Sequence, residues 1–136
     1  MQQRRWLAIP DEQVAEALQA IFKTRLFGVY TSTDVAGAEI AGALKNVVAI
    51  AAGMAQGLGA GDNTRAVVIA RSLAELTRLG VAMGGQPATF AGLAGMGDLV
   101  ATCISPHGRN RYVGEQLALG KTVDAITAEM NMWPRG

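Results

Sequence analysis

The sequence predicts a mainly α-helical domain that follows a short helix–strand unit. Alanine and glycine are plentiful, whereas aromatic residues make up 5% of the 136 residues, and this mix favours closely packed helices over a β-sandwich. Half of the residues are hydrophobic, so the chain can bury the core of one modest domain. From residue 32 onward, the sequence contains apolar segments of helical length. Each begins near capping residues and ends at glycine or proline. Together these observations predict a bundle of helices.

The N-terminal unit is predicted from residues 10–31. Pro10, Asp11 and Glu12 are typical of a helix start, and apolar residues at positions 14, 18, 21 and 22 then mark one helical face. The apolar run at residues 26–31 predicts a strand. Because a single strand cannot form a sheet, we interpret this unit as the end of a sheet domain whose remainder is not in the chain.

Five helices are expected after residue 31. Ser32, Thr33 or Asp34 can cap a long helix over residues 36–60, and residues 62–64 can cap a second helix that ends near residues 84–87. A third helix is expected over residues 90–104, followed by a turn at residues 105–108. A fourth should run from residues 109–110 to residue 119, and a fifth should begin at residue 123.

Composition excludes several classes of function. The net charge of +1 gives no reason to expect nucleic acid as a partner, and one cysteine with one histidine allows neither an internal disulfide nor a structural zinc site. The N-terminus lacks the apolar core of a signal peptide, so a cytoplasmic location is expected. Residues 36–60 are long enough to span a membrane, but they include Glu39, Lys45, Asn46 and Gln56. We interpret them as a buried helix and expect no membrane span.

Lys45 lies in the middle of this apolar helix. Its neighbours on the same helical face are alanine, glycine and valine, with no acidic or polar side chain among them. In a partly dry cleft, desolvation disfavours the charged ammonium, which suits a general acid or base. The alternative is a lysine whose stem covers apolar surface while its amine reaches water.

Residues 105–111 form a second candidate site. If a helix begins near Asn110, its free backbone N–H groups and its dipole face the preceding loop. Arg109 can add a bidentate contact to a phosphate or carboxylate, and Gly108 lets an oxyanion approach the backbone. An ordinary polar turn with solvated arginines is the alternative.

Asp98 and Thr102 form a third candidate. A carboxylate between glycines and an apolar stretch needs a partner, and Lys45 is one candidate, although Asp98 can also act as a helix cap. Thr102, four residues later, shares the helical face of Asp98 and can donate a hydrogen bond there. Cys103 is interpreted as a buried inert thiol and His107 as a solvated loop residue.

The glycine clusters do not form a dinucleotide-binding loop. Gly57, Gly59 and Gly61 follow a predicted helix, whereas the phosphate-binding fingerprint must follow a strand, and the glycines at 92, 95 and 97 have the wrong spacing. Close helix packing or turn geometry explains them better.

Four segments, in the right order, resemble the glycerol-3-phosphate dehydrogenases. They are Glu-Ile-Ala-Gly-Ala-Leu-Lys-Asn at residues 39–46, Gly-Leu-Gly-Ala-Gly-Asp-Asn-Thr at residues 57–64, Thr-Phe-Ala-Gly-Leu-Ala-Gly-Met-Gly-Asp at residues 89–98 and Gly-Arg-Asn-Arg at residues 108–111. The similarity runs from about residue 26 to residue 132. The resemblance implies NAD- or NADP-dependent interconversion of sn-glycerol 3-phosphate and dihydroxyacetone phosphate, a phosphorylated triose.

The resemblance also implies roles for the candidate residues. Lys45 would be the proton acceptor for the C2 hydroxyl, and Asp98 would orient it. Arg109 and the helix start after it would hold the phosphate, with Arg109 also near the cofactor. The remaining substrate contacts would come from Asn46, Thr102, Gly108 and Asn110.

The implied fold is the helical bundle of the 6-phosphogluconate dehydrogenase C-terminal-like type. Residues 1–31 would be a remnant of the N-terminal dinucleotide-binding (Rossmann) domain, and residues 32–136 a C-terminally truncated substrate-binding domain. The chain departs from the family pattern at Gly108, where serine is common, at Gly28, where arginine is common, and at residues 133–136, where the family has a cofactor-contacting glutamate. We therefore expect a fragment that does not turn over alone, and a homodimer is one arrangement open to it.

Two other interpretations compete with this one. The chain could be a non-catalytic helical association module or degenerate remnant, whose uncovered apolar faces favour self-association. It could also belong to a relative that oxidises another phosphorylated hydroxy acid.

Overall fold

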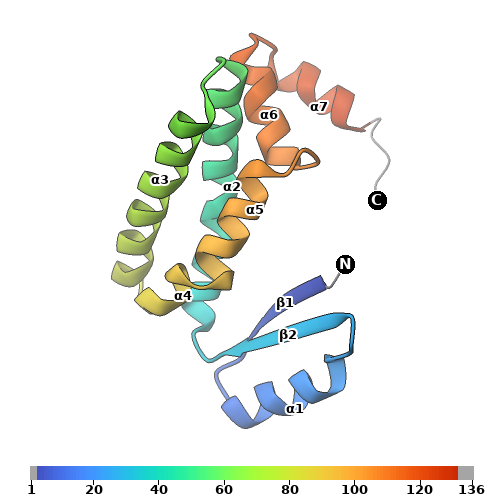
Figure 1. Cartoon of the computed structure of the whole chain (residues 1–136), viewed down its shortest axis with the longest axis vertical. Coiled ribbons are helices and arrows are strands. Elements are labelled where there is room, and N and C mark those ends of the chain that lie inside the picture. Colours follow the sequence, from blue (N-terminus) through green and yellow to red (C-terminus); the bar gives the residue numbers. More distant parts are fainter. Residues whose placement is uncertain (1–2, 132–136) are drawn as a thin grey trace.

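The computed structural model describes residues 3–131, which form a helical bundle with a small β-α-β unit at one end (Figure 1). The predicted departure at residues 133–136 lies outside the described residues. The elements are β1 (Gln3–Ala8), α1 (Glu12–Phe22), β2 (Phe27–Ser32), α2 (Val35–Gly57), α3 (Asp62–Ala82), α4 (Pro87–Ala91), η1 (Leu93–Gly97), α5 (Asp98–Ile104), α6 (Arg109–Ala118) and α7 (Val123–Asn131).

The N-terminal unit contains one strand more than the sequence predicted. β1 pairs in parallel with β2, from Gln3 opposite Phe27 to Ala8 opposite Ser32, and α1 connects the two strands. β1 was missed because Gln-Arg-Arg-Trp-Leu-Ala shows no clear alternation, and its pairing is with a strand distant in sequence. The predicted apolar face of α1 is largely exposed, since two strands are too narrow to cover it.

Asp34 is the N-cap of α2 and is one of the three predicted capping positions. Its buried carboxylate accepts hydrogen bonds from the Gly37 N–H (2.9 Å), the Gln86 N–H (2.8 Å) and the Thr89 hydroxyl (2.6 Å). Burial raises the pKa of this carboxyl, but the bonds from Thr89, Gln86 and Gly37 outweigh it and leave the pKa below its ordinary value. One side chain therefore caps α2 and also fixes the start of α4.

α2 is the central helix of the bundle and packs most closely against α6. A Cβ added to Gly53 would lie 2.0 Å from the carbonyl oxygen of Arg111, and one added to Gly114 would lie 1.9 Å from that of Ile50. These glycines let the two backbones approach each other, in line with the closely packed helices that the alanine and glycine content favours. By length and composition α2 could cross a membrane, with a mean hydropathy of 1.5, but it lies among α3, α5 and α6 (Figure 1).

Two clusters of buried side chains form the core around α2. One consists of Ala49, Ala52, Leu99 and Cys103, with Ile69 and Leu73 of α3 packed against it. The other consists of Ala41, Leu76 and Phe90. Small residues on α2 thus face large residues on its neighbours, which brings α3 and α5 close to the central helix.

Two expectations about helix boundaries were wrong. α3 begins after Gly61, which makes no side-chain cap, and Asp62 instead pairs with Arg65 within the first turn. The predicted helix over residues 90–104 is broken into α4, the π-helical turn η1 and α5. The break occurs at Gly92, whose backbone is extended, and a Cβ on Gly95 would lie 2.2 Å from the carbonyl oxygen of Phe90.

α6 and α7 lie near the predicted positions and are joined by a polar cluster. Glu129 accepts hydrogen bonds from the Tyr112 hydroxyl at 2.9 Å and from Lys121 Nζ at 2.8 Å. The bond from Lys121, followed by that from Tyr112, lowers the pKa of Glu129, and the same bonds raise the pKa of each donor. This cluster holds α7 against the end of the bundle.

Candidate functional site

Lys45 and Asp98 form an ion pair across the bundle. The Lys45 Nζ donates to a carboxylate oxygen of Asp98, although 53 residues separate them in the sequence. The Lys45 side chain is 23% exposed and that of Asp98 is 44% exposed, so the pair lies at the border between core and solvent. The structure therefore places the lysine in a partly dry setting, with the partner that the sequence suggested for it.

The π-helical turn η1 sets the position of Asp98. A π-helix widens the backbone by one residue per turn and is frequent next to functional sites. Here the widened turn ends where α5 begins, and Asp98 is the first residue of α5. The Thr102 hydroxyl donates to the backbone carbonyl of Asp98 at 2.6 Å, rather than to its carboxylate. Thr102 therefore supports the backbone of this residue, which differs from the predicted contact within the site.

Asn46 and Asn110 connect the lysine helix to the candidate anion site. The Asn110 side-chain amide donates to the side-chain oxygen of Asn46 at 2.8 Å. Asn46 follows Lys45 on α2, and Asn110 lies in the first turn of α6. The structure thus brings together two predicted site residues that are 64 positions apart in the sequence.

Arg109 is the first residue of α6 and has an exposed side chain. Within residues 3–131, no hydrogen bond or ion pair holds its guanidinium group. Gly108 is the N-cap of α6, and its backbone is extended there. The start of α6 and Arg109 thus leave donors available for an anion, with Asn110 linking them to α2.

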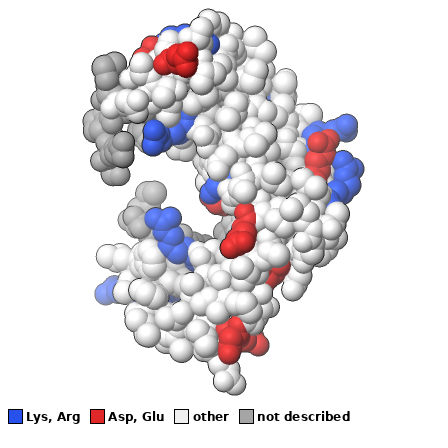
Figure 2. Space-filling model, turned by 180° about the vertical axis from the view of Figure 1, so that it is seen from behind, with Lys and Arg blue, Asp and Glu red and all other residues white. Residues whose placement is uncertain are grey.

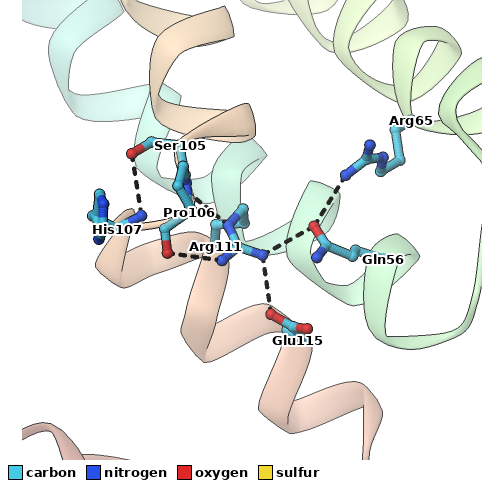
Figure 3. A network of polar contacts seen from close by, with 7 residues as sticks. All are labelled: Gln56, Arg65, Ser105, Pro106, His107, Arg111 and Glu115. Atoms are coloured by element: carbon cyan, nitrogen blue, oxygen red, sulfur yellow. Dashed lines mark hydrogen bonds and ion pairs between the residues drawn. The ribbon is translucent and has the colours of Figure 1, made fainter.

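Arg111 is the residue of this segment that the sequence analysis misjudged. It is 7% exposed, and Figure 3 shows it bonded to the loop before α6, to Glu115 and to Gln56. The alternative prediction, that the arginines of this turn are solvated, is therefore wrong for Arg111. Arg109, in contrast, has an exposed side chain. The available signal was the i,i+4 spacing of Arg111 and Glu115 on one helix.

A hollow of about 330 Å³ lies beside Asp98, between the strands and the η1–α5 segment. The Trp6 and Tyr30 rings stack in its wall, with ring centroids 6.3 Å apart. Its lining residues are Arg5, Trp6, Tyr30, Leu93, Ala94, Gly97, Asp98 and Ala101. From behind, the molecule is hollowed between its strand end and its α6–α7 end, with charged groups of both signs around the opening (Figure 2). No sequence signal pointed to Trp6 or Tyr30.

The two remaining candidates stay outside this site. Cys103 is buried in the core, and burial raises the pKa of its thiol. His107 is exposed in the loop, where its backbone N–H donates to the Ser105 hydroxyl oxygen at 3.3 Å. Their locations agree with the predicted buried thiol and solvated loop residue. Within residues 3–131 there is no cluster of three metal-ligating side chains.

The described residues do not fit a whole nicotinamide dinucleotide. The pyrophosphate of such a cofactor needs a glycine-rich turn between a strand and a helix. β1 is joined to α1 by Ile-Pro-Asp at residues 9–11, without glycine, and Gly57–Gly61 follow a helix. The hollow beside Asp98 has room for a planar ring, but among residues 3–131 no turn of this kind holds the phosphates.

Comparison with known proteins shows which sequences and folds this chain resembles. Residues 34–136 match the family described as the NAD-dependent glycerol-3-phosphate dehydrogenase C-terminus. Over 130 residues the chain is 62% identical to glycerol-3-phosphate dehydrogenase [NAD(P)+] 2 of Sphingopyxis alaskensis, a match that covers 96% of this chain and 39% of that protein. It is also 62% identical to the corresponding enzyme of Mycobacterium avium, covering 96% of this chain and 38% of that protein.

Solved structures show the same arrangement. The glycerol-3-phosphate dehydrogenase of Coxiella burnetii superposes with a TM-score of 0.92 at 36% identity, covering 98% of this chain and 41% of that one. The enzyme of Saccharomyces cerevisiae gives a TM-score of 0.84 at 33% identity, with 98% and 41% covered. The chain thus spans less than half the length of the relatives that it matches.

Proposed function

This chain belongs to the family of the NAD-dependent glycerol-3-phosphate dehydrogenase C-terminus. We propose that it supplies the proton-transferring and phosphate-binding residues for the interconversion of sn-glycerol 3-phosphate and dihydroxyacetone phosphate. The observation that carries the proposal is the ion pair of Lys45 and Asp98. A lysine amine that is partly withdrawn from water and aligned by a carboxylate has the features of a positioned general acid or base.

The step assigned to this chain is a proton transfer at C2 of the substrate. In the oxidation direction Lys45 would accept the proton of the C2 hydroxyl while a nicotinamide bound in the complete enzyme would take the hydride from C2. In the reduction direction that nicotinamide would supply the hydride to C2, and Lys45 would return the proton to the substrate oxygen. Asp98 orients the amine and stabilises the ammonium that forms. Thr102 holds the backbone of Asp98, so that the carboxylate keeps its direction.

The phosphate group of the substrate is assigned to the start of α6. Arg109 supplies a planar fork of N–H donors, and the free backbone N–H groups of the first turn add to it. The hydrogen bond of Asn110 to Asn46 fixes this turn next to the residue that follows Lys45. The separation between Lys45 and the proposed phosphate site is thus set by the packing of α6 on α2.

Turnover by the chain alone is not expected. The reaction needs a nicotinamide held in a fixed position, and the described residues provide no glycine-rich turn for its phosphates. An assay of NADH oxidation with dihydroxyacetone phosphate measures this directly. Robust turnover by this chain would contradict the expectation.

Calorimetric titration of the chain with glycerol 3-phosphate tests the proposed site. We expect weak but saturable binding at millimolar ligand, and we expect Arg109→Ala to reduce the affinity about tenfold because it removes a charge-assisted hydrogen bond. Arg78→Ala is the matched control, since it removes an exposed arginine of α3 that pairs with Glu75 at 3.9 Å. Absence of binding to the unchanged chain, or equal losses in both variants, would overturn the proposal.

One observation favours self-association as a second function. An apolar groove of about 580 Å³ runs between α3 and α5, and Val67, Met83 and Ile104 on these helices and their flanks are each about 60% exposed. A homodimer in the cytoplasm is our proposal for the free chain. Sedimentation over a range of concentrations tests it, and a monomer at every concentration would exclude it.

A further inference from the structure

We propose that Arg111 is a positioning residue, which holds the loop at residues 105–108 so that Arg109 and the first turn of α6 face the substrate phosphate. The inference rests on the phosphate site proposed above. Arg111 itself does not face that site, because its guanidinium group is directed inward. Its role is to fix the backbone from which Arg109 projects.

The guanidinium group of Arg111 grips the loop through two successive carbonyl groups. Its Nε donates to the Ser105 carbonyl oxygen at 2.8 Å and its Nη2 donates to that of Pro106 at 3.1 Å. The Ser105 oxygen also accepts the Gly108 N–H at 3.1 Å, which closes the turn. These bonds join the end of α5 to the start of α6 (Figure 3).

The other side of the same guanidinium group is bonded to the bundle. Its Nη1 donates to Glu115 at 3.0 Å and to the side-chain oxygen of Gln56 at 2.9 Å. Gln56 also accepts from Arg65 of α3 at 3.1 Å. One side chain therefore connects the loop to α6, to the end of the lysine helix α2 and, through Gln56, to α3.

The surroundings of Arg111 favour a single arrangement. A buried cation without partners is costly, so the guanidinium group stays where Glu115 and the three oxygen acceptors satisfy it. A Cβ on Gly108 would lie 3.0 Å from the Thr102 carbonyl oxygen, so the loop is also packed tightly against α5. Without the Arg111 guanidinium group, the loop loses the two hydrogen bonds that orient residues 105 and 106. The backbone position of Arg109 is then no longer fixed.

Lysine cannot replace the planar guanidinium group of Arg111. Its ammonium keeps the charge next to Glu115 but is a point donor without the planar geometry that reaches two carbonyl groups and Gln56 together. Arg111→Lys is therefore the variant that separates charge from geometry. Glu115→Gln is the matched control, because it removes the ion pair and leaves both loop bonds in place.

The experiment is a titration of the ¹⁵N-labelled chain with glycerol 3-phosphate, followed at the backbone amides. In the unchanged chain we expect ligand-dependent shifts at residues 109–110, and we expect Arg111→Lys to weaken the binding about tenfold while the remaining amide spectrum is preserved. Glu115→Gln should bind within about twofold of the unchanged chain, because the glutamine side-chain oxygen can still accept from Nη1 and both loop bonds remain.

The outcomes separate the two proposals. If the unchanged chain shows no shifts at residues 109–110, the proposed phosphate site is wrong. If it binds, Arg109→Ala loses binding and Arg111→Lys binds as well as the unchanged chain, the site stands and the positioning role of Arg111 is wrong. If Glu115→Gln loses as much affinity as Arg111→Lys, the ion pair rather than the loop bonds is responsible, and the inference also fails.

A second measurement covers the case in which Arg111→Lys does not fold. The Nε–H of Arg111 in the unchanged chain should exchange slowly with solvent, because it is buried and bonded to the Ser105 carbonyl. Slow exchange at this group, in the presence and absence of glycerol 3-phosphate, supports the proposal that Arg111 holds the loop at residues 105–108. Rapid exchange in the folded chain would show that the loop is not held by this side chain.

Discussion

At the scale of single residues, the fold depends on buried charges whose hydrogen bonds are satisfied by distant parts of the chain. Asp34 accepts three hydrogen bonds, from α2, from the residue before α4 and from α4 itself. Arg111 donates to the loop before α6 and to α2. Each of these residues thus connects elements that are distant in the sequence, Asp34 joining α2 to α4 and Arg111 joining α6 to α2.

Replacing Asp34 with asparagine is expected to destabilise the chain by about 2 kcal/mol at neutral pH, since the amide cannot accept three hydrogen bonds as well as a carboxylate does. The pKa of Asp34 is lower in the folded chain than its ordinary value of about 3.9. Its contribution to stability is therefore complete above that value and is lost as the pH falls through the lower folded-state pKa.

Urea unfolding of the helical bundle, followed by far-ultraviolet circular dichroism from about pH 6 to about pH 2, checks this prediction. The free energy of unfolding of the unchanged chain should decline more steeply at the acidic end than that of Asp34→Asn. The exposed Asp124, replaced in the same way, serves as the control and should change stability by less than about 0.5 kcal/mol. Parallel pH curves for the Asp34 variant and the unchanged chain would contradict the account.

At the scale of elements, the approach of α6 to α2 determines how far the phosphate site lies from the lysine. The two helices meet through glycine, with the Gly114 Cα facing the Ile50 carbonyl and the Gly53 Cα facing that of Arg111. Because α2 carries Lys45 and α6 begins at Arg109, a change in their separation alters the space between proton acceptor and phosphate site. Small residues at this contact therefore serve the site as well as the core.

Gly114→Ala is expected to destabilise the chain by about 3 kcal/mol, because its Cβ would lie 1.9 Å from a backbone oxygen and the helices would have to separate. Gly42→Ala, also within a helix, meets no atom within 4 Å and should stabilise the chain by about 0.5–1 kcal/mol. Thermal unfolding of the two variants compares them. A loss of stability in Gly42→Ala as large as that in Gly114→Ala would show that helix contact is not the cause.

At the scale of the whole molecule, the β-α-β unit is the least supported part. A two-stranded sheet is marginal without further packing, and α1 leaves Val14, Ile21 and Phe22 exposed. The Trp6 indole N–H is buried, and among residues 3–131 it has no hydrogen-bond partner. The hollow beside Asp98 separates this unit from η1 and α5, so the helical bundle does not depend on it for its core.

Unfolding in urea should therefore occur in two steps. In a Trp133→Phe variant, fluorescence reports on Trp6 in β1, whereas far-ultraviolet circular dichroism reports mainly on the helices. We expect the fluorescence transition at the lower urea concentration, since few apolar groups of the strand unit are buried. Coincident transitions would indicate one cooperative unit and contradict this expectation.

Sequence alone predicted the helical class, three positions that include the cap of α2, the approximate bounds of α2 and α6, and the start of α7, and it named the candidate site residues. These features follow from local signals, namely capping residues, glycine breaks, apolar segments and motifs within short stretches of chain. Tertiary structure decided the pairing of Lys45 with Asp98 and of Asn46 with Asn110, the break of the third helix at Gly92, the parallel strand β1 and the burial of Arg111. Each of these depends on groups distant in sequence, because a buried charge or an unpaired strand is stabilised by whichever partner the packing brings to it.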